Sequence, residues 1–324
     1  MRTPRLNRRE FVAGTGMTLF GALGTANARP DDPDSPSHWR PSIVAHRGFA
    51  GIYPENTALA ARRASRGPHY SRAAMIEIDV MPTRDGDVVV FHDDRLSSRD
   101  GGERGLTDES GVVWETPTDV VTSASVLDSN ETVPLLSDVL AEIPPHVGVN
   151  IEFKNPGSHD VVFGPAGDAL ENQRAIWRPF TERVLEICSG VDNPVLVSSF
   201  YEAAIAEIRE QAPGLPVGFL LWDSIVDGLE VVRRYDCEAI HPPRNMIKNT
   251  PFFGDEYYTD GPFANIDLID VAREEQRVVN VYTITDWYQA TQLANAGVDG
   301  LICDYPNLIS HPGRTTSKNS NTYQ

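Results

Sequence analysis

Short runs rich in β-branched residues alternate with longer helical stretches along most of the chain, and this alternation restricts the possible folds more than any other feature. A strand–helix–strand rhythm favours parallel strands in one sheet, because each helix returns the chain to the edge where the last strand began. The expected strands are Ile43–Ala45, Met75–Val80, Val88–His92, Val149–Phe153, Val195–Ser199, Val217–Leu221, Ala239–His241, Val278–Thr283 and Gly300–Asp304. The expected helices are Thr57–Arg66, Leu136–Ile143, Gly167–Cys188, Tyr201–Gln211, Ile225–Tyr235, Ile266–Glu275 and Trp287–Ala296.

Nine strands are one more than a closed barrel of eight requires. The strand at 88–92 follows the strand at 75–80 across the turn Arg84-Asp85-Gly86-Asp87, so it can pair locally and leave eight strands for the ring. We therefore predict an α/β fold of the TIM-type (β/α)8 barrel, which 324 residues can accommodate. An open doubly wound sheet is the second choice, and no glycine-rich nucleotide fingerprint supports it.

Two carboxylates share one face of a strand that should be buried. Side chains alternate along Met75–Val80, so Glu77 and Asp79 point to one side while Ile78 points to the other. Burying two carboxylates costs on the order of several kcal/mol unless a cation or hydrogen-bond donors compensate their charge. A divalent metal ion is the simplest compensation, and an edge strand with a wet polar face is the alternative.

The strand Val149–Phe153 repeats this polar face. Glu152 and Lys154 lie on the side opposite Ile151. If the two acidic faces look into one space, Glu77, Asp79 and Glu152 supply three oxygen ligands, which suits one divalent cation, Mg²⁺ or Ca²⁺. Lys154 would then lie beside the cation as a fixed positive charge, although a Glu-x-Lys strand is also common in surface salt bridges.

Two histidines follow strands, at the face where barrel enzymes assemble their chemistry. His46 ends the first strand and His92 ends the strand at 88–92. Cleavage of a phosphodiester needs one group that accepts a proton from the nucleophile and another that donates one to the leaving alkoxide, and imidazole suits both tasks. Arg47 presents a fork of donors that matches the oxygens of a phosphate.

Seven motifs in order resemble the glycerophosphodiester phosphodiesterase family across roughly residues 43–308. They are His46-Arg47-Gly48, Pro54-Glu55-Asn56-Thr57, Glu77-x-Asp79, Thr83-x-Asp85-Gly86, His92-Asp93, Glu152-x-Lys154 and the run from Gly297 to Pro306. The resemblance implies a TIM-type barrel with a small insertion after the second histidine, which corresponds to residues 93–131. It also implies hydrolysis of a small glycerophosphodiester to glycerol 3-phosphate and an alcohol, with Ca²⁺ or Mg²⁺.

The same resemblance implies roles for individual residues. It assigns the metal to Glu77, Asp79 and Glu152, and it makes His46 and His92 the catalytic acid–base pair.

Around these groups, the resemblance makes Arg47 and Lys154 the residues that hold the phosphate. Glu55 and Asn56, at the entrance to the first helix, would shape the site and bond phosphate or glycerol. Helix capping by Asn56 is an equal alternative.

Two positions depart from the pattern of the family. Tyr282 stands where the family often has tryptophan on the seventh strand, and Cys303 stands where it usually has threonine. We expect both to lie near the pocket and to alter which substrate fits. The aromatic loop at 243–263 is as consistent with packing against the barrel as with substrate contact.

The charge of the chain excludes one class of partner. The formal net charge is −18, and only three of the 28 basic residues are lysine. Nucleic acid is therefore not expected to bind, because phosphate backbones require a basic surface. An acidic shell of this kind resembles proteins adapted to high salt, where screening weakens the repulsion between like charges.

The ends of the chain are expected to lie outside the catalytic domain. Residues 1–28 resemble a twin-arginine signal peptide, with Arg8 and Arg9 before an uncharged stretch that ends in a small-residue cleavage pattern. We expect a flexible leader at 29–41, one domain at 42–310, a disordered tail at 311–324, and an exported protein without a stable membrane anchor. Three scattered cysteines form no metal motif and no complete disulfide framework.

Two rival functions remain at this point. The same barrel could act on intact lipids as a phospholipase of the C or D type, which the aromatic loop keeps open. It could also be a catalytically silent protein that binds phosphate, although a binding protein needs no pair of histidines.

Overall fold

The computed structural model describes residues 41–66, 73–97, 106–162, 164, 166–256 and 263–309. The expected signal peptide, the tail at 311–324 and all but the last residue of the leader lie outside these ranges. No helix in the described part of the chain is long and apolar enough to cross a bilayer.

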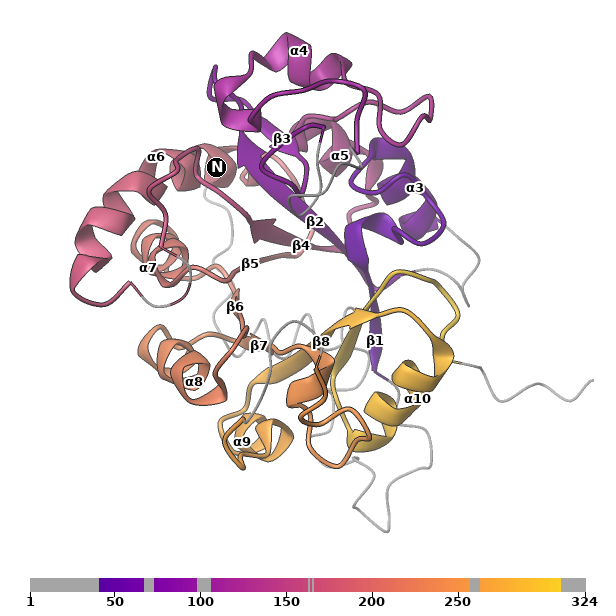
Figure 1. Cartoon of the computed structure of the whole chain (residues 1–324), viewed down its shortest axis with the longest axis vertical. Helices are drawn as coiled ribbons and strands as arrows, with labels where there is room; N and C mark the ends of the chain where they lie inside the picture. Colours follow the sequence, from indigo (N-terminus) through magenta and orange to yellow (C-terminus); the bar gives the residue numbers. More distant parts are fainter. Residues whose placement is uncertain are drawn as a thin grey trace, which may run out of the picture.

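Eight parallel strands close into a barrel, as the sequence predicts (Figure 1). The ring runs β1-β2-β4-β5-β6-β7-β8-β9 and back to β1, and β3 pairs antiparallel with β2. The strands are β1 (Ser42–Ala45), β2 (Met75–Pro82), β3 (Val88–Val90), β4 (Gly148–Phe153), β5 (Val195–Ser199), β6 (Val217–Leu220), β7 (Ala239–His241), β8 (Val278–Ile284) and β9 (Gly300–Cys303).

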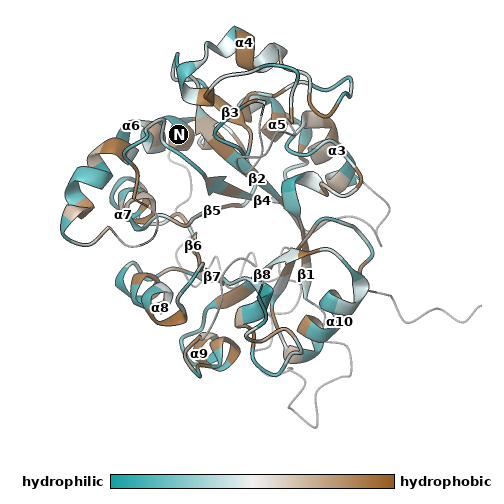
Figure 2. Ribbon diagram, viewed as in Figure 1, coloured by the Kyte–Doolittle hydropathy of each residue, from teal (hydrophilic) through white to brown (hydrophobic). Residues whose placement is uncertain are grey.

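Helices surround the ring, and Figure 2 shows their apolar residues mainly on the sides that face the strands. The α-helices are α3 (Ala58–Arg66), α4 (Thr118–Ser123), α5 (Leu136–Glu142), α6 (Leu170–Cys188), α7 (Glu202–Gln211), α8 (Ile225–Arg234), α9 (Leu268–Glu274) and α10 (Trp287–Ala296). Short 3-10 turns are η2 (His46–Gly48), η3 (Val113–Glu115), η4 (Gly167–Ala169) and η5 (Arg244–Met246). The seven expected helices are all present, and α4 is an addition.

Alternation along each barrel strand divides the apolar residues between two cores. On β2, Ile76 and Ile78 face outward and join the large core between the strands and the helices. Met75 faces inward and packs with Val44 and Leu196 inside the barrel. The outward face of β2 is therefore apolar, and its inward face is free to carry polar groups at the mouth.

The insertion after β3 is a small lobe with its own core, and Figure 1 shows it beyond the rim of the barrel. Val89 and Phe91 from the hairpin pack there with Trp114, Val121 and Val126. The lobe contains η3 and α4, and isolated bridges replace regular strands. Its elements are too short to produce a clear period of 3.6 or 2 residues, which explains why the sequence indicated an insertion but not its helix.

A buried polar pair lies inside the barrel where TIM barrels usually carry branched apolar side chains. His241 on β7 is fully buried, and its Nε2 lies 3.1 Å from Nδ2 of Asn280 on β8. Gly218 leaves space for the imidazole, because a Cβ there would come within 2.8 Å of His241 Nε2. Burial lowers the pKa of His241 to about 3, since the charged imidazolium would lose its hydration.

The depressed pKa of His241 predicts that the fold loses stability in mild acid. The unfolded imidazole binds a proton below its ordinary pKa of 6.5, while the folded one stays neutral down to about 3. Stability is therefore lost as the pH falls from about 6.5 toward 3. Relative to His241→Asn, the free energy of unfolding of the native chain should fall by about 1.3 kcal/mol between about pH 7 and about pH 5.5. Urea titrations at both pH values measure this, and a pH-independent difference would contradict it.

Candidate active site

Three carboxylates from two adjacent strands converge at the mouth of the barrel. The parallel register of β2 and β4 places Asp79 opposite Glu152 and Glu77 opposite Asn150. One oxygen each of Glu77, Asp79 and Glu152 lies within 4.8 Å of the others, and all three residues are buried. The convergence expected from the alternation of the two strands is therefore present.

The electrostatics of this cluster favour a bound cation. Burial, and then repulsion from Asp79 and Glu152, hold the pKa of Glu77 well above its ordinary value. Burial also raises the pKa of Glu152, despite the attraction of Lys154. Glu77 Oε1 is buried without a hydrogen-bond partner among the described residues. Three crowded carboxylates with an unpartnered oxygen form a donor set that fits a hard divalent cation.

Asp79 differs from its two neighbours because fixed cations surround it. Burial opposes its ionisation, but Arg47, Lys154 and a hydrogen bond from Asn56 together outweigh burial and lower its pKa. Arg47 Nε lies 3.2 Å from Asp79 Oδ2, and Lys154 Nζ lies 3.8 Å from Asp79 Oδ1. Lys154 Nζ also donates to Glu152 Oε1 at 2.7 Å. Arg47 and Lys154 line the same cavity as Glu77 and Glu152.

Glu55 and Asn56 lie behind these groups and not among the residues that line the cavity. Asn56 Nδ2 donates to Asp79 Oδ2 at 2.8 Å, and Asn56 Oδ1 accepts the backbone N–H of Asp79 at 3.2 Å. The cap of α3 is instead Thr57, whose Oγ1 accepts the N–H of Ala60 at 3.1 Å. Asn56 is therefore not the helix cap that the sequence left open, and its amide holds the carboxylate of Asp79 in place.

The turn after β1 aims His46 and Arg47 into the cavity. The backbone N–H of Arg47 donates to Glu77 Oε2 at 2.8 Å, which ties the turn to the carboxylate cluster. Gly48 adopts a φ of +77°, and a Cβ there would come within 2.7 Å of the Cβ of Ala60. Only glycine meets both conditions without strain, which explains the sequence His46-Arg47-Gly48 at this turn.

Each histidine is paired with a carboxylate that the sequence analysis did not assign to the site. His46 Nδ1 lies 2.5 Å from Asp304 Oδ1, and His92 Nδ1 lies 2.6 Å from Asp93 Oδ1. An ionised carboxylate only accepts, so it favours the tautomer of each neutral ring that carries its proton on Nδ1. Two features of the sequence could have indicated these partners. Asp93 directly follows His92, and Asp304 directly follows the last strand as His46 follows the first.

His92 reaches the cavity by a route that differs from the expected one. β3 is antiparallel and ends at Val90, so His92 does not extend a strand of the parallel ring. The β2–β3 hairpin passes beyond the rim and returns, and the N–H of Phe91 donates to the carbonyl of Asp79 at 2.9 Å. This bond returns the chain toward the carboxylate cluster, and His92 lines the same cavity as Glu77 and Glu152.

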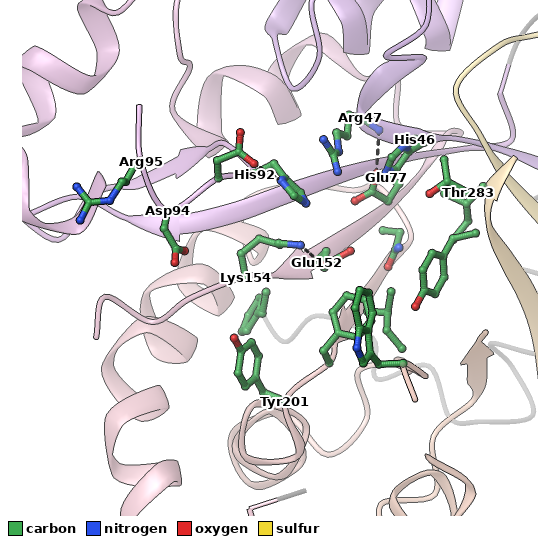
Figure 3. Close-up of a pocket in the computed structure, with 18 residues that line it drawn as sticks. His46, Arg47, Glu77, His92, Asp94, Arg95, Glu152, Lys154, Tyr201 and Thr283 are labelled. Carbon is green, nitrogen blue, oxygen red and sulfur yellow. Dashed lines mark hydrogen bonds and ion pairs between the residues drawn. The ribbon is translucent and has the colours of Figure 1, made fainter. Parts of the chain in front are cut away.

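Most of the charged groups line one cavity of about 540 Å³, among them both histidines, Glu77, Glu152, Arg47 and Lys154, whereas Asp79 and Asp304 are not among its lining residues. Figure 3 shows His46, Arg47 and His92 on one side, Glu152 and Lys154 in the middle and Tyr201 on the far side. The charged lining comes from β1 to β4 and the segments that follow them. From β5 onward the lining is mainly aromatic or apolar: Phe200, Tyr201, Leu220, Trp222, Tyr282 and Ile302.

Cys303 and the described phenylalanines of the aromatic loop do not lie where a role in the pocket would place them. Tyr282 lines the cavity as expected, but Cys303 faces outward into the core between the barrel and the helices, and its neighbour Ile302 lines the cavity instead. In the aromatic loop, Phe252, Phe253 and Phe263 pack against that same core. The other two aromatic residues of this loop lie outside the described residues.

Comparison with known proteins identifies the family. Residues 46–308 match the glycerophosphoryl diester phosphodiesterase family. The chain belongs to this family. It is accordingly a phosphoric diester hydrolase. The chain is similar to a glycerophosphodiester phosphodiesterase of Bacillus altitudinis, with 27% identity over 82% of this chain and 95% of the relative.

Solved structures show the same fold as this member of the glycerophosphoryl diester phosphodiesterase family. A phosphodiesterase of Oleispira antarctica, solved in complex with the product sn-glycerol-3-phosphate, matches with a TM-score of 0.62 and 24% identity, over 83% of this chain and 94% of that one. A glycerophosphodiester phosphodiesterase of Thermotoga maritima matches with a TM-score of 0.57 and 22% identity, over 84% and 96%. The TIM-type barrel is therefore the fold of this chain.

The carboxylate cluster predicts a measurable response to divalent cations. Added Ca²⁺ or Mg²⁺ should raise the melting temperature by ~5 °C near saturation, because a ligand of the folded state alone stabilises it. Glu152→Gln should lose most of this shift, since it removes one ligand charge. Differential scanning fluorimetry after chelator treatment measures both.

The matched control is Asp270→Asn, an exposed carboxylate on α9 whose side chain is bonded to Arg273. This variant should keep the full shift. Equal shifts in the native chain and in both variants would place cation binding elsewhere on the acidic surface.

Proposed function

We propose that this protein hydrolyses glycerophosphodiesters to glycerol 3-phosphate and an alcohol with a divalent cation and two histidines. One observation carries the proposal: two carboxylate-paired histidines line the same cavity as Glu77 and Glu152, which converge with the buried Asp79. A binding protein would need donors for the phosphate but no such proton-transfer groups.

Different residues of the site would bind the cation and orient the phosphate. Glu77, Asp79 and Glu152 would hold Ca²⁺ or Mg²⁺, which neutralises phosphate charge as it develops in the transition state. Arg47 and Lys154 line the cavity and would orient the remaining phosphate oxygens. Both stay protonated through the reaction, because nearby carboxylates raise the pKa of each despite its burial.

His46 and His92 then move the protons. One Nε2 accepts a proton from the nucleophile, which is water or a neighbouring hydroxyl of the substrate, and the other donates a proton to the departing alkoxide. Asp304 and Asp93 hold the rings in the tautomer that this exchange requires. They act through the histidines and are positioning residues.

The relatives support this choice of substrate. The protein of Bacillus altitudinis is named a glycerophosphodiester phosphodiesterase, and that of Oleispira antarctica was solved with glycerol 3-phosphate as its product. The rivals are a phospholipase of the C or D type and a silent phosphate-binding protein. Cleavage of intact phospholipid vesicles would favour the first, and phosphate binding without turnover would favour the second.

Removal of either histidine should abolish most of the turnover. His46→Ala and His92→Ala should each lower kcat on glycerophosphocholine by about 10²–10⁴-fold, the usual contribution of a positioned acid or base. Each should also remove a different limb of the pH–rate profile. Coupled detection of released glycerol 3-phosphate, with and without chelator, measures the loss.

The control is His159→Ala, because His159 is exposed, bonds Glu115 and lies outside the cavity. It should keep native kcat. Native activity in either active-site variant, or full activity in chelator, would contradict the mechanism.

We also propose that the chain is exported. Support comes from Arg8 and Arg9 before the uncharged stretch and from the small-residue pattern at Ala26-Asn27-Ala28.

Lysine at both positions of the arginine pair should block export while the charge is conserved, because a twin-arginine signal is read by its two guanidinium groups. Cell fractionation of the full chain with Arg8→Lys and Arg9→Lys should show accumulation in the cytoplasm, and Arg5→Lys is the matched control. Equal export of the three chains would rule out this route.

A further inference from the structure

An aromatic wall occupies the part of the cavity that the proposed chemistry leaves unused. We define it as Phe200 after β5, Trp222 after β6 and Tyr282 on β8. The phosphate-handling groups come from the other half of the barrel, so a substrate held there directs one of its two ester groups toward this wall. The wall therefore contacts a part of the substrate other than the phosphate.

The rings of the aromatic wall form a corner and not a stack. Phe200 lies 5.8 Å from Trp222 at an interplanar angle of 85° and 5.9 Å from Tyr282 at 88°, measured between ring centroids. Tyr282 is 6% exposed, and its hydroxyl donates to the carbonyl of Leu221. Its polar end is therefore engaged by the backbone, and perpendicular rings present π faces in more than one direction.

The ammonium group of Lys154 already lies over one ring of the aromatic wall. Lys154 Nζ lies 5.7 Å from the centroid of Phe200, within the range of a cation–π contact. A primary ammonium group brings N–H donors that need acceptors, and such a group is better satisfied by carboxylates, as Lys154 is by Glu152. A fully methylated ammonium group has no N–H to satisfy and suits a corner of rings.

A further carboxylate in the lining of the same cavity adds attraction for positive charge. Asp94 lines the cavity on the side where Tyr201 lies (Figure 3). Burial raises the pKa of Tyr201, and the charge of Asp94 raises it further, so the two groups are electrostatically coupled. The formal net charge of −18 also draws cationic substrates in preference to anionic ones.

From this geometry we propose that the aromatic wall is a subsite for a quaternary trimethylammonium group, so that the protein selects choline among the possible head groups. The inference rests on the proposed function, because the phosphate must lie at the charged half of the cavity. Phe200, Trp222 and Tyr282 form the subsite, and Asp94 supplies long-range attraction.

A binding experiment can measure the contribution of the positive charge of the head group to affinity. Phosphocholine and neohexyl phosphate have nearly the same shape, but carbon replaces the quaternary nitrogen in the second. Calorimetry in the presence of Ca²⁺ should show about tenfold tighter binding of phosphocholine, as expected for a desolvated cation–π site. Equal Kd values would overturn the subsite, because the wall would then be merely apolar.

Variants of Trp222 separate the aromatic effect from a loss of packing. Trp222→Leu should reduce the preference for phosphocholine to about twofold or less, and Trp222→Phe should keep most of it, because a π face remains. The matched control is Trp287→Leu, since Trp287 is 67% exposed on α10 and does not line the cavity. An unchanged preference in Trp222→Leu would overturn the assignment.

Turnover distinguishes failure of this inference from failure of the proposed function. The native chain should hydrolyse glycerophosphocholine with about tenfold higher kcat/KM than glycerophosphoglycerol. Hydrolysis of both at equal kcat/KM would overturn only the choline subsite. Preferential binding of phosphocholine without hydrolysis of either diester would support the subsite and overturn the proposed function.

Discussion

Compensation of buried negative charge at the mouth of the barrel is the constraint on which the rest of the site depends. Asp79 is kept ionised by Arg47, Lys154 and the amide of Asn56, and each of these contacts comes from a different segment of the chain. A buried carboxylate without such partners would take up a proton and lose its value as a metal ligand. The turn after β1, the start of α3 and the end of β4 are therefore positioned by one shared requirement.

The strands that carry this charge could be predicted from the sequence because alternation is a local property. Glu77 and Asp79 are two positions apart, so their common face follows from the geometry of a strand alone. The closed ring followed from the strand–helix rhythm, and Glu152 joined the cluster because β4 showed the same alternation. Local periodicity was thus sufficient to predict the barrel and the convergence of the three carboxylates.

Other parts of the site depend on contacts that no local pattern contains. Asp304 is separated from His46 by 258 positions, and only closure of the barrel brings them together. Cys303 was placed near the pocket by analogy, but the register of β9 turns it outward. Asn56 itself adopts a φ of +57°, and its contacts with Asp79 depend on this backbone conformation. The sequence patterns of helices and strands do not describe such a conformation.

The separate core beneath the insertion affects how this enzyme can change over evolutionary time. His92 follows a hairpin strand whose Val89 and Phe91 pack into the lobe while Val88 and Val90 pack into the main core, whereas His46 follows β1, a strand of the barrel itself. Substitutions within the lobe therefore act on the position of one cavity histidine while the ring and its carboxylate cluster stay intact. Selection can therefore change the support of one of the two cavity histidines with little effect on the barrel that keeps the molecule folded.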